Sequence, residues 1–203
     1  KVDVYHKGKL VPGVEIFPYI SVLKPLLGNA MLDLGGTTAS LGIDKERKVF
    51  SNPFNSGKMA PIICYESIYG EFVTDYVKKG ANFLGIMTND SWWGETQGHK
   101  QLMAYARMRA IETRREIARS ANSGISAHID AKGEVLADTL YGDKTALFAK
   151  VNLYEHQTFY TRAGDLLSRI SIFVFGFLIF YNWIKKYQNR KPQEPMKKIV
   201  IKR

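Results

Sequence analysis

The chain has 203 residues, of which 45% are hydrophobic and 12% aromatic, a composition that excludes a disordered protein and provides for one substantial core. Its formal net charge is +10, but residues 185–203 carry eight Lys and Arg side chains against one Glu, which leaves +3 for the rest of the chain. Because this excess lies in a short segment and accompanies no nucleic-acid-binding motif, we expect no binding to nucleic acid. The single cysteine, Cys64, excludes an intramolecular disulfide.

The first half of the chain alternates apolar runs with segments rich in turn residues, which is typical of strands joined by loops. The apolar run at residues 59–64 predicts a buried strand, and residues 82–88 predict a second one. Between them, a helix is predicted over residues 69–79, ended by Gly80. The remaining expectations are a weak strand at 2–5, an apolar proline-containing loop at 11–27, and short strands with turns at 35–58.

The second half contains the clearest helical pattern of the chain. Over residues 100–118, apolar residues recur at near-helical spacing, namely Leu102, Met103, Ala106, Ala110, Ile111 and Ile117. The interleaved Arg and Glu residues are expected to pair with one another rather than to bind phosphate. Further along, we expect a strand at 124–129, a turn at 130–134, a return strand from 135 and a last strand at 145–151. Strands that alternate with helices in this way indicate the α/β class.

Residues 170–184 form a run of fifteen residues without a charge. This run is shorter than the about 20 residues that span a bilayer, but the preceding leucines extend it if Arg169 snorkels to the interface. Tyr181 and Trp183 fit an aromatic belt, and the basic segment after them predicts a cytoplasmic C-terminus. A buried core helix is the alternative. The expected organisation is therefore a globular domain at 1–165, a transmembrane helix at 166–184 and a basic cytoplasmic tail at 185–203.

Cys64 ends the predicted strand at 59–64, and a turn separates it from the predicted helix at 69–79. A thiol close to a helix N-terminus is placed in a positive potential that favours the thiolate, which is the nucleophilic form. The backbone N–H groups after it would be free to bind an oxyanion, and the positive charge of Lys7 would stabilise both the thiolate and that oxyanion. The alternative is that Cys64 is a small buried hydrophobe and Lys7 a solvated side chain.

The loop at residues 89–99 contains Trp92 and Trp93 between polar residues and glycines. Two tryptophans on such a loop favour a lipid-facing lid, with core packing as the alternative. Asn89 and Asp90 are expected to shape the turn after the strand, with a reach into the active site as the alternative. The four histidines are scattered without metal-ligand spacing, so we expect no metal and no cofactor.

Four segments resemble, in this order, the bacterial apolipoprotein N-acyltransferases, which are membrane enzymes with an extracytoplasmic domain of the nitrilase fold. They are YHKGKLVPGVE at 5–15, PIICYES at 61–67, TNDSWWG at 88–94 and RMRAIETRREIARSANSGIS at 107–126, followed by the apolar helix. The resemblance implies an α/β fold, a nitrilase-like αββα sandwich, for residues 1–165. It also implies that the front part of the sandwich, several transmembrane helices and a general-base Glu precede residue 1, so we expect this chain alone to be inactive.

The resemblance implies catalytic roles for two residues, since Lys7 matches the family lysine and Cys64 matches the nucleophile. Glu15 and Glu66 match acids of the family that line the site and support the lysine and the acyl intermediate. Tyr65 and Trp92 match aromatic residues near the cysteine and the acyl-chain entrance. The chain departs from the family pattern at two places. Leu102 stands where relatives often have His, and the lysine loop reads PGVE where the proteobacterial form reads PFGE.

The implied reaction is an acyl transfer through a thioester on Cys64. The implied acyl donor is a phospholipid, and the implied acceptor is the N-terminal amine of a diacylglyceryl-cysteine in an apolipoprotein. The resemblance places the protein in the bacterial inner membrane, with its catalytic domain on the periplasmic side. Two alternatives stay open: a membrane-tethered amidase of the nitrilase superfamily that hydrolyses a C–N bond, and a non-catalytic membrane-anchored interaction domain in which Cys64 is a packing residue.

Overall fold

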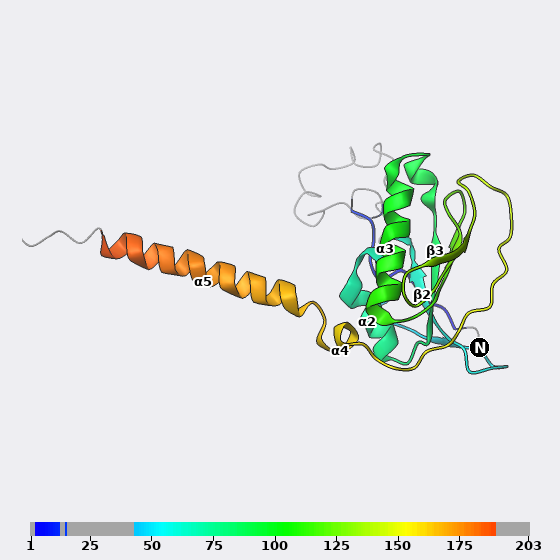
Figure 1. Ribbon diagram of the computed structural model, residues 1–203, viewed down its shortest axis with the longest axis horizontal. Helices are drawn as coiled ribbons and strands as arrows, with labels where there is room; N and C mark the ends of the chain where they lie inside the picture. Colours follow the sequence, from blue (N-terminus) through cyan, green and yellow to red (C-terminus); the bar gives the residue numbers. More distant parts are fainter. Residues whose placement is uncertain (1–2, 13–14, 16–42, 190–203) are drawn as a thin grey trace, which may run out of the picture. The chain divides into compact units, whose positions relative to one another are not determined.

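The computed structural model describes residues 3–12, 15 and 43–189, and the chain divides into two units, residues 1–164 and 165–203. Among the described residues of the first unit, six strands form a mixed sheet in the order of the sequence (Figure 1). The strands are β1 (Phe50–Ser51), β2 (Lys58–Ile63), β3 (Phe83–Thr88), β4 (Ile117–Ala121), β5 (Ala127–Ile129) and β6 (Val135–Asp138). β2, β3 and β4 run parallel to one another, whereas the other neighbouring pairs are antiparallel.

Two helices connect the parallel strands, because parallel neighbours need a crossover. α2 (Gly70–Lys78) joins β2 to β3, and α3 (Gln97–Thr113) joins β3 to β4; the two helices contact each other and lie along the sheet (Figure 1). Buried apolar residues from the strands and the helices form one core, which includes Ile62, Leu84, Ile86, Ile117, Val73, Tyr76, Ala106 and Ala110. A shorter helix, α4 (Phe159–Ala163), ends the unit.

The register of the parallel strands brings their carboxyl ends to one edge of the sheet. Ile63 at the end of β2 pairs with Met87, and Thr88 at the end of β3 pairs with Ala121 at the end of β4. The residues that directly follow these three strands are therefore neighbours in space. In open α/β sheets, this edge is where ligands bind.

Several predicted elements are confirmed. The strands expected at 59–64 and 82–88 correspond to β2 and β3, and the turn expected at 130–134 joins β5 to β6. The helix expected over 100–118 is wrong at its end, because Arg114 adopts a left-handed conformation with φ of 51° and the chain then enters β4. Ile117, which fits the helical spacing, is instead a fully buried residue of that strand.

Two predicted strands are wrong in the part of the chain that the structure describes. Residues 3–5, the described part of the strand expected at 2–5, and residues 145–151 belong to no strand. The later segment continues into residues 152–156, which form no strand but are held by side-chain hydrogen bonds and by one backbone hydrogen bond, from the Tyr154 N–H to the Asn82 carbonyl oxygen (3.1 Å). Buried Arg115 donates one of these bonds to the carbonyl oxygen of His156, over 2.8 Å. The loop expected at 11–27 lies mostly outside the described residues.

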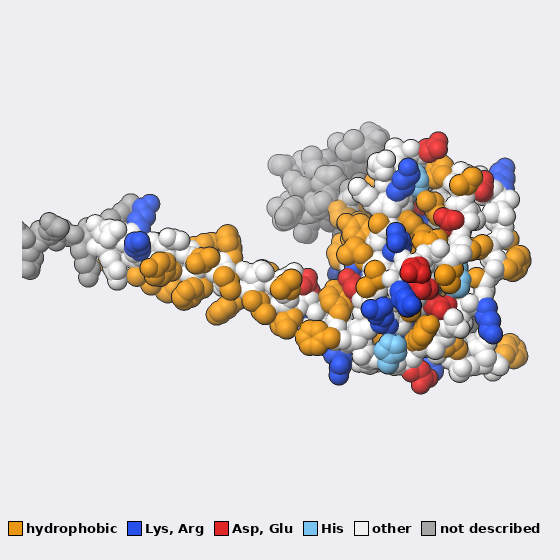
Figure 2. Space-filling view, in the orientation of Figure 1, with side chains coloured by type: hydrophobic (Ala, Val, Ile, Leu, Met, Phe, Trp, Pro, Cys, Tyr) orange, Lys and Arg blue, Asp and Glu red, His pale blue; other side chains and the backbone are white. Residues whose placement is uncertain are grey.

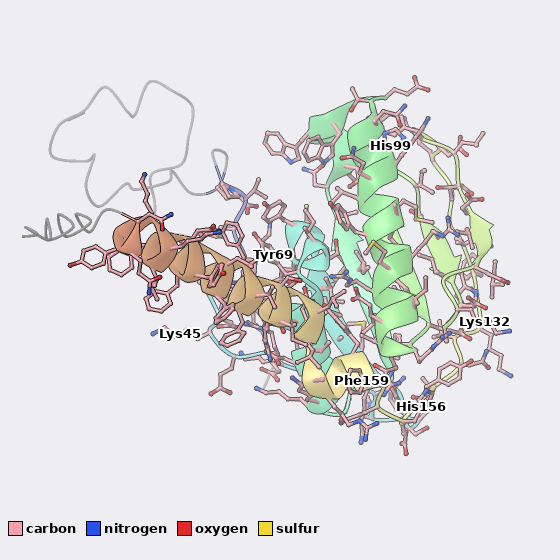
Figure 3. All side chains as sticks on the ribbon, turned by 60° about the vertical axis from the view of Figure 1, so that its left-hand side comes forward. Lys45, Tyr69, His99, Lys132, His156 and Phe159 are labelled. Carbon is pink, nitrogen blue, oxygen red and sulfur yellow. The ribbon has the colours of Figure 1, made fainter. Side chains whose placement is uncertain are left out.

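Buried Glu116, which precedes β4, is the centre of the hydrogen-bond network that holds residues 152–156. Its carboxylate accepts hydrogen bonds from the backbone N–H of Asn152 (2.9 Å) and from the Asn152 side chain (2.7 Å), and it lies 2.9 Å from His128 Nε2. Burial by itself would raise the pKa of Glu116, but the bonds from Asn152 and His128 outweigh burial and hold that pKa below its ordinary value. Figure 3 shows His99 at the start of α3 and His156 near its other end, so this network lies at the amino ends of the parallel strands.

The second unit contains one helix among its described residues, α5 (Leu166–Gln188), which begins at the cap residue Asp165. It is 23 residues long, its most apolar window has a mean hydropathy of 1.6, and none of that window is buried. Figure 2 shows hydrophobic side chains along its length and basic side chains toward its end. By length and composition, this helix is able to cross a membrane.

Candidate active site

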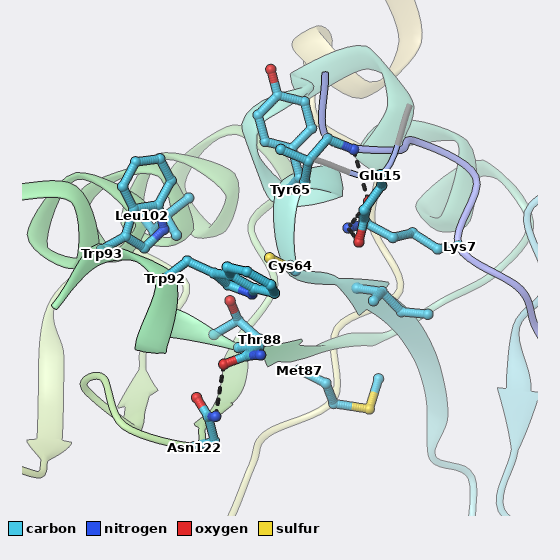
Figure 4. A pocket seen from close by; sticks show the side chains of 13 residues that line it. Lys7, Glu15, Cys64, Tyr65, Met87, Thr88, Trp92, Trp93, Leu102 and Asn122 are labelled. Atoms are coloured by element: carbon cyan, nitrogen blue, oxygen red, sulfur yellow. Dashed lines mark hydrogen bonds and ion pairs between the residues drawn. The ribbon is translucent and has the colours of Figure 1, made fainter. Parts of the chain in front are cut away.

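A cavity of about 680 Å³ lies at the carboxyl ends of the parallel strands (Figure 4). Its wall combines the ends of β2 and β3, the loop after β4, the start of α3 and the segment near the N-terminus. The lining residues are Lys7, Val11, Glu15, Ile63, Cys64, Tyr65, Met87, Thr88, Asn89, Trp92, Trp93, Leu102 and Asn122. Five of the six residues to which the resemblance assigns a role therefore line one cavity, and the sixth, Glu66, does not.

Cys64 directly follows β2 and is half-buried in this wall. Its φ of 51° lies in the left-handed region, which among the described non-glycine residues is shared with Arg114 alone. Such a conformation costs about 1–3 kcal/mol and recurs at active sites, where the surrounding structure enforces it. The sharp turn directs the chain away from the strand and leaves the sulfur at the cavity (Figure 4).

The helix expected over 69–79 is confirmed as α2, whose start lies within one residue of the expected one. A short 3₁₀ helix, η2 (Cys64–Ile68), precedes it, and α2 begins at Gly70. Cys64 therefore stands at the start of η2 rather than next to the N-terminus of α2, and the expected effect of an α-helix N-terminus on the thiol stays a prediction. Among the described residues that line the cavity, Lys7 is the one cation.

Glu66 lies behind this turn and is fully buried. Its carboxylate accepts hydrogen bonds from the Ile63 backbone N–H (2.7 Å), the Gly8 backbone N–H (2.5 Å) and the Tyr5 hydroxyl (2.7 Å). These bonds tie the Cys64 turn to the segment that carries Lys7. Glu66 is thus absent from the residues that line the cavity, contrary to expectation, and it contacts the turn from the other side.

Lys7 and Glu15 form an ion pair on one side of Cys64 (Figure 4). The Lys7 Nζ lies 2.8 and 2.7 Å from the two carboxylate oxygens of Glu15, and the Val11 backbone N–H donates to the same carboxylate over 2.8 Å. The Lys7 side chain is only 12% exposed. An ammonium group has three N–H donors, so the two contacts with Glu15 leave one donor that no other described residue uses.

Aromatic and aliphatic side chains form most of the remaining wall. Trp92 and Trp93 belong to η3 (Asp90–Trp93) and are 70% and 43% exposed, which fits the expected lid better than core packing. The Trp93 ring packs over Gly98 of α3, where an added Cβ would lie 2.5 Å from the ring. Leu102, the residue at the position where relatives often have His, also contributes an apolar surface.

The loop below these tryptophans is fixed by a buried ion pair. Asp90 is fully buried, accepts a hydrogen bond from the Thr88 hydroxyl (2.7 Å) and lies 2.8 Å from Arg119 Nη2. This confirms that Asp90 shapes the turn. Arg119 faces the interior, and Arg109 pairs with Glu112 over 2.9 Å, as expected for internal ion pairing. Arg115 differs, because it binds backbone carbonyls instead of a carboxylate.

Asn122 is a cavity residue that the sequence did not single out. It follows β4 just as Asn89 follows β3, and its side chain donates a hydrogen bond of 2.7 Å to Asn89 Oδ1. The signal that would have identified it is the strand register, because Thr88 and Ala121 are paired. In the part of the chain that the structure describes, no group of three or more His, Cys, Asp or Glu residues is able to hold a metal ion.

The sequence resemblance implies a nitrilase fold. The structure has a mixed sheet in an α/β arrangement, with Cys64 and Lys7 at the carboxyl edge of the parallel strands. The family model for carbon–nitrogen hydrolases matches residues 1–159. The chain therefore belongs to the carbon–nitrogen hydrolase family, and the predicted nitrilase-type fold is confirmed. An amidase from Nesterenkonia is 18% identical with a TM-score of 0.42, over 53% of this chain and 43% of that one, a likeness too distant to bear on the site.

Within that family, the chain is similar to apolipoprotein N-acyltransferases. The enzyme of Chlorobaculum tepidum is 36% identical over 188 residues, which are 91% of this chain and 35% of that protein. The enzyme of Haemophilus influenzae is 34% identical over 80% of this chain and 30% of its own length. Apolipoprotein N-acyltransferase 2 of Leptospira interrogans is 40% identical over 62% of this chain and 22% of its own length. The chain thus spans about a third of the length of the first two relatives.

Proposed function

We propose that the chain is the part of a membrane-anchored N-acyltransferase that carries the nucleophile, and that it acylates the N-terminal amine of lipoproteins. One observation carries this proposal. Cys64 stands in an enforced left-handed conformation at a cavity whose wall also holds Lys7 and two exposed tryptophans. The similarity to proteins named apolipoprotein N-acyltransferase supports the choice of reaction.

In the first step, the Cys64 thiolate attacks an ester carbonyl carbon of a phospholipid, and a C–S bond forms. The carbonyl oxygen becomes an oxyanion, which the Lys7 ammonium and the backbone N–H groups after Cys64 stabilise. The intermediate collapses, the ester C–O bond breaks, and the lysophospholipid oxygen takes up the proton that the thiol released. Glu15 is the one carboxylate among the described cavity residues, and Lys7 and Val11 occupy it, so we assign the proton transfer to the general-base Glu that the family resemblance implies and that matches no residue of this chain.

In the second step, the free α-amine of a diacylglyceryl-cysteine attacks the thioester carbonyl. The C–S bond breaks, an amide forms, and the amine proton returns to the sulfur. An amide is more stable than a thioester, so this step is favourable. Water as the acceptor would give a hydrolase instead, which is the second candidate because the family is named for carbon–nitrogen hydrolysis.

The apolar character of the cavity and of α5 suits substrates that are themselves lipids. Met87, Leu102 and the two tryptophans would accommodate acyl chains, and α5 would hold the domain at the bilayer surface. We assign the protein to the inner membrane, with residues 1–165 on the periplasmic side, a span at 166–184 and a cytoplasmic tail at 185–203. The basic residues after α5 support this orientation.

The test uses the protein expressed from its complete gene, incubated with a phospholipid that carries a labelled acyl chain. We expect the label to appear on a diacylglyceryl-cysteine peptide when that peptide is present, and Cys64→Ala to abolish this transfer. Release of labelled free acid at the same rate with and without the peptide would identify a hydrolase and contradict the proposal. A Cys64→Ala variant with undiminished transfer would exclude the cysteine as nucleophile.

A further inference from the structure

An amide pair lies on the cavity wall on the far side of Cys64 from Lys7. Figure 4 shows Asn122 and Lys7 on opposite sides of the cysteine, with a hydrogen bond drawn from Asn122 to the neighbouring amide, Asn89. Asn89 follows β3, the direct neighbour of the strand that ends at Cys64. Since adjacent strands lie about 4.8 Å apart, the amide and the thiol come from neighbouring strand ends at the same edge of the sheet.

The hydrogen bonds of this pair fix which atom of each amide is the oxygen. The Asp90 backbone N–H lies 3.1 Å from Asn122 Oδ1, and the Ser91 backbone N–H lies 3.3 Å from Asn89 Oδ1. A backbone N–H is only a donor, so both contacted atoms are acceptors. Asn122 Nδ2 then donates to Asn89 Oδ1 over 2.7 Å, and the Ser91 hydroxyl also contacts that oxygen.

All of these contacts with Asn89 are made to its side-chain oxygen, and none is made by its side-chain nitrogen. Asn89 Oδ1 receives three donors, whereas Nδ2 has no acceptor among the residues that the structure describes. The side chain is exposed and lines the cavity. To cap the N-terminus of η3, Asn89 needs only its side-chain oxygen, which accepts the hydrogen bond from the Ser91 N–H. The arrangement instead holds a neutral N–H₂ donor group in a fixed orientation beside the nucleophile.

We infer that Asn89 is a substrate-binding residue of the proposed transfer reaction, whose Nδ2 donates to the carbonyl oxygen of the acyl group under attack. This inference rests on the proposed function. The attacked carbon must come within bonding distance of the Cys64 sulfur, so its oxygen lies between the donors on the two sides of the cysteine. A phosphate group would instead favour a cationic partner, whereas a neutral amide suits a carbonyl oxygen that gains charge only in the transition state.

The same acyl carbonyl is attacked twice, first by Cys64 and then by the amine. A donor to this oxygen therefore assists both half-reactions, whereas a contact to the phospholipid headgroup assists only the first. A contact to the lipoprotein assists only the second. Measuring the two half-reactions separately distinguishes the three cases.

The experiment uses the protein from its complete gene in detergent micelles. One assay measures acyl-enzyme formation from a labelled phospholipid, and the other measures transfer from the isolated acyl-enzyme to a diacylglyceryl-cysteine peptide. Asn89→Ala should slow both steps by about 10²-fold, the usual effect of removing one oxyanion donor. Asn89→Asp keeps an acceptor for the Ser91 N–H and so retains the turn, and it should slow both steps at least as much. Asn55→Asp, which introduces the same change in an exposed turn outside this cavity, should leave both rates unchanged.

Three results would overturn the inference: slowing of the first step alone, slowing of the second step alone, or wild-type rates in both Asn89 variants. These results differ from a failure of the proposed function, in which the wild-type protein itself would form no acyl-enzyme or would pass the acyl group only to water. Asn122→Ala provides a further check. It removes one donor that orients Asn89, so it should slow both steps together by a smaller factor.

Discussion

The carboxyl and amino ends of the parallel strands carry similar polar side chains in different surroundings. At the carboxyl end, Cys64, Lys7 and Asn89 face a cavity, and each has a reactive atom or a donor that no other described residue uses. At the amino end, Glu116 is buried, and its carboxylate bonds to Asn152 and His128. In the proposed function, the carboxyl end recognises substrate, whereas the amino end holds the fold together.

The largest expected effect on stability comes from the amino end. Glu116→Ala leaves His128 and Asn152 without their partner, and breaking a buried pair of this kind costs about 3–5 kcal/mol. We expect chemical denaturation of the complete protein to show this loss in its free energy of unfolding. Glu134→Ala, at an exposed carboxylate, is the matched control and should change the stability by less than about 0.5 kcal/mol.

If Glu116→Ala unfolded at the wild-type denaturant concentration, the amino-end network would not be the scaffold that the comparison requires. The folded fraction of this variant should also retain the wild-type rate of acyl-enzyme formation per folded molecule. A large fall in that rate would mean that the two ends of the sheet are not functionally separate.

The carboxyl end should respond in the opposite way. Lys7→Met keeps an unbranched side chain as far as the ε position but removes the ammonium group, so acyl-enzyme formation should fall by about 10²–10³-fold, as when an oxyanion donor is lost. The effect on unfolding should be smaller than that of Glu116→Ala, because the Glu15 side chain is 28% exposed and keeps the hydrogen bond from the Val11 N–H. Lys9→Met is the control in the same segment, since Lys9 lies over the rings of Tyr69 and Phe72 and is not among the cavity residues. Equal rates for the two variants would contradict the role of Lys7.

The smallest effect concerns pH. The hydrogen bonds to Glu116 hold its folded-state pKa below the ordinary value of 4.5. A carboxyl group with a lowered pKa stabilises the fold above its unfolded value, and this stabilisation is lost as the pH falls through the folded value. The melting temperature should therefore decrease below about pH 4.5, and Glu116→Gln should make it less dependent on pH in that range. An equally steep decrease in the variant would assign the acid sensitivity to other groups.

The sequence was informative where local patterns decide the structure. The apolar runs of β2 and β3 and the turn between β5 and β6 are visible in the residues themselves. The end of α3 was not, because Ile117 fits the helical spacing and is assigned to β4 only by pairing with Leu84 on β3. The run at 145–151 has residues typical of a strand but meets no described strand partner.

The site shows the same limit. Cys64, Lys7, Glu15, Tyr65 and Trp92 follow from the resemblance, and the structure brings all five to one cavity. Two features depend on the contacts between distant segments and have no local signal. One is the buried position of Glu66 behind the Cys64 turn, and the other is the orientation of the Asn89 amide, which needs the register between β3 and β4.

The most direct test of the account is to locate the acyl group on the enzyme. The protein from its complete gene would be incubated with phospholipid without an acceptor, digested and analysed by mass spectrometry. We expect one acyl chain on the sulfur of Cys64, removed when a diacylglyceryl-cysteine peptide is added. An acyl group on another residue, or an active enzyme that never carries one, would contradict the claim that Cys64 is the nucleophile.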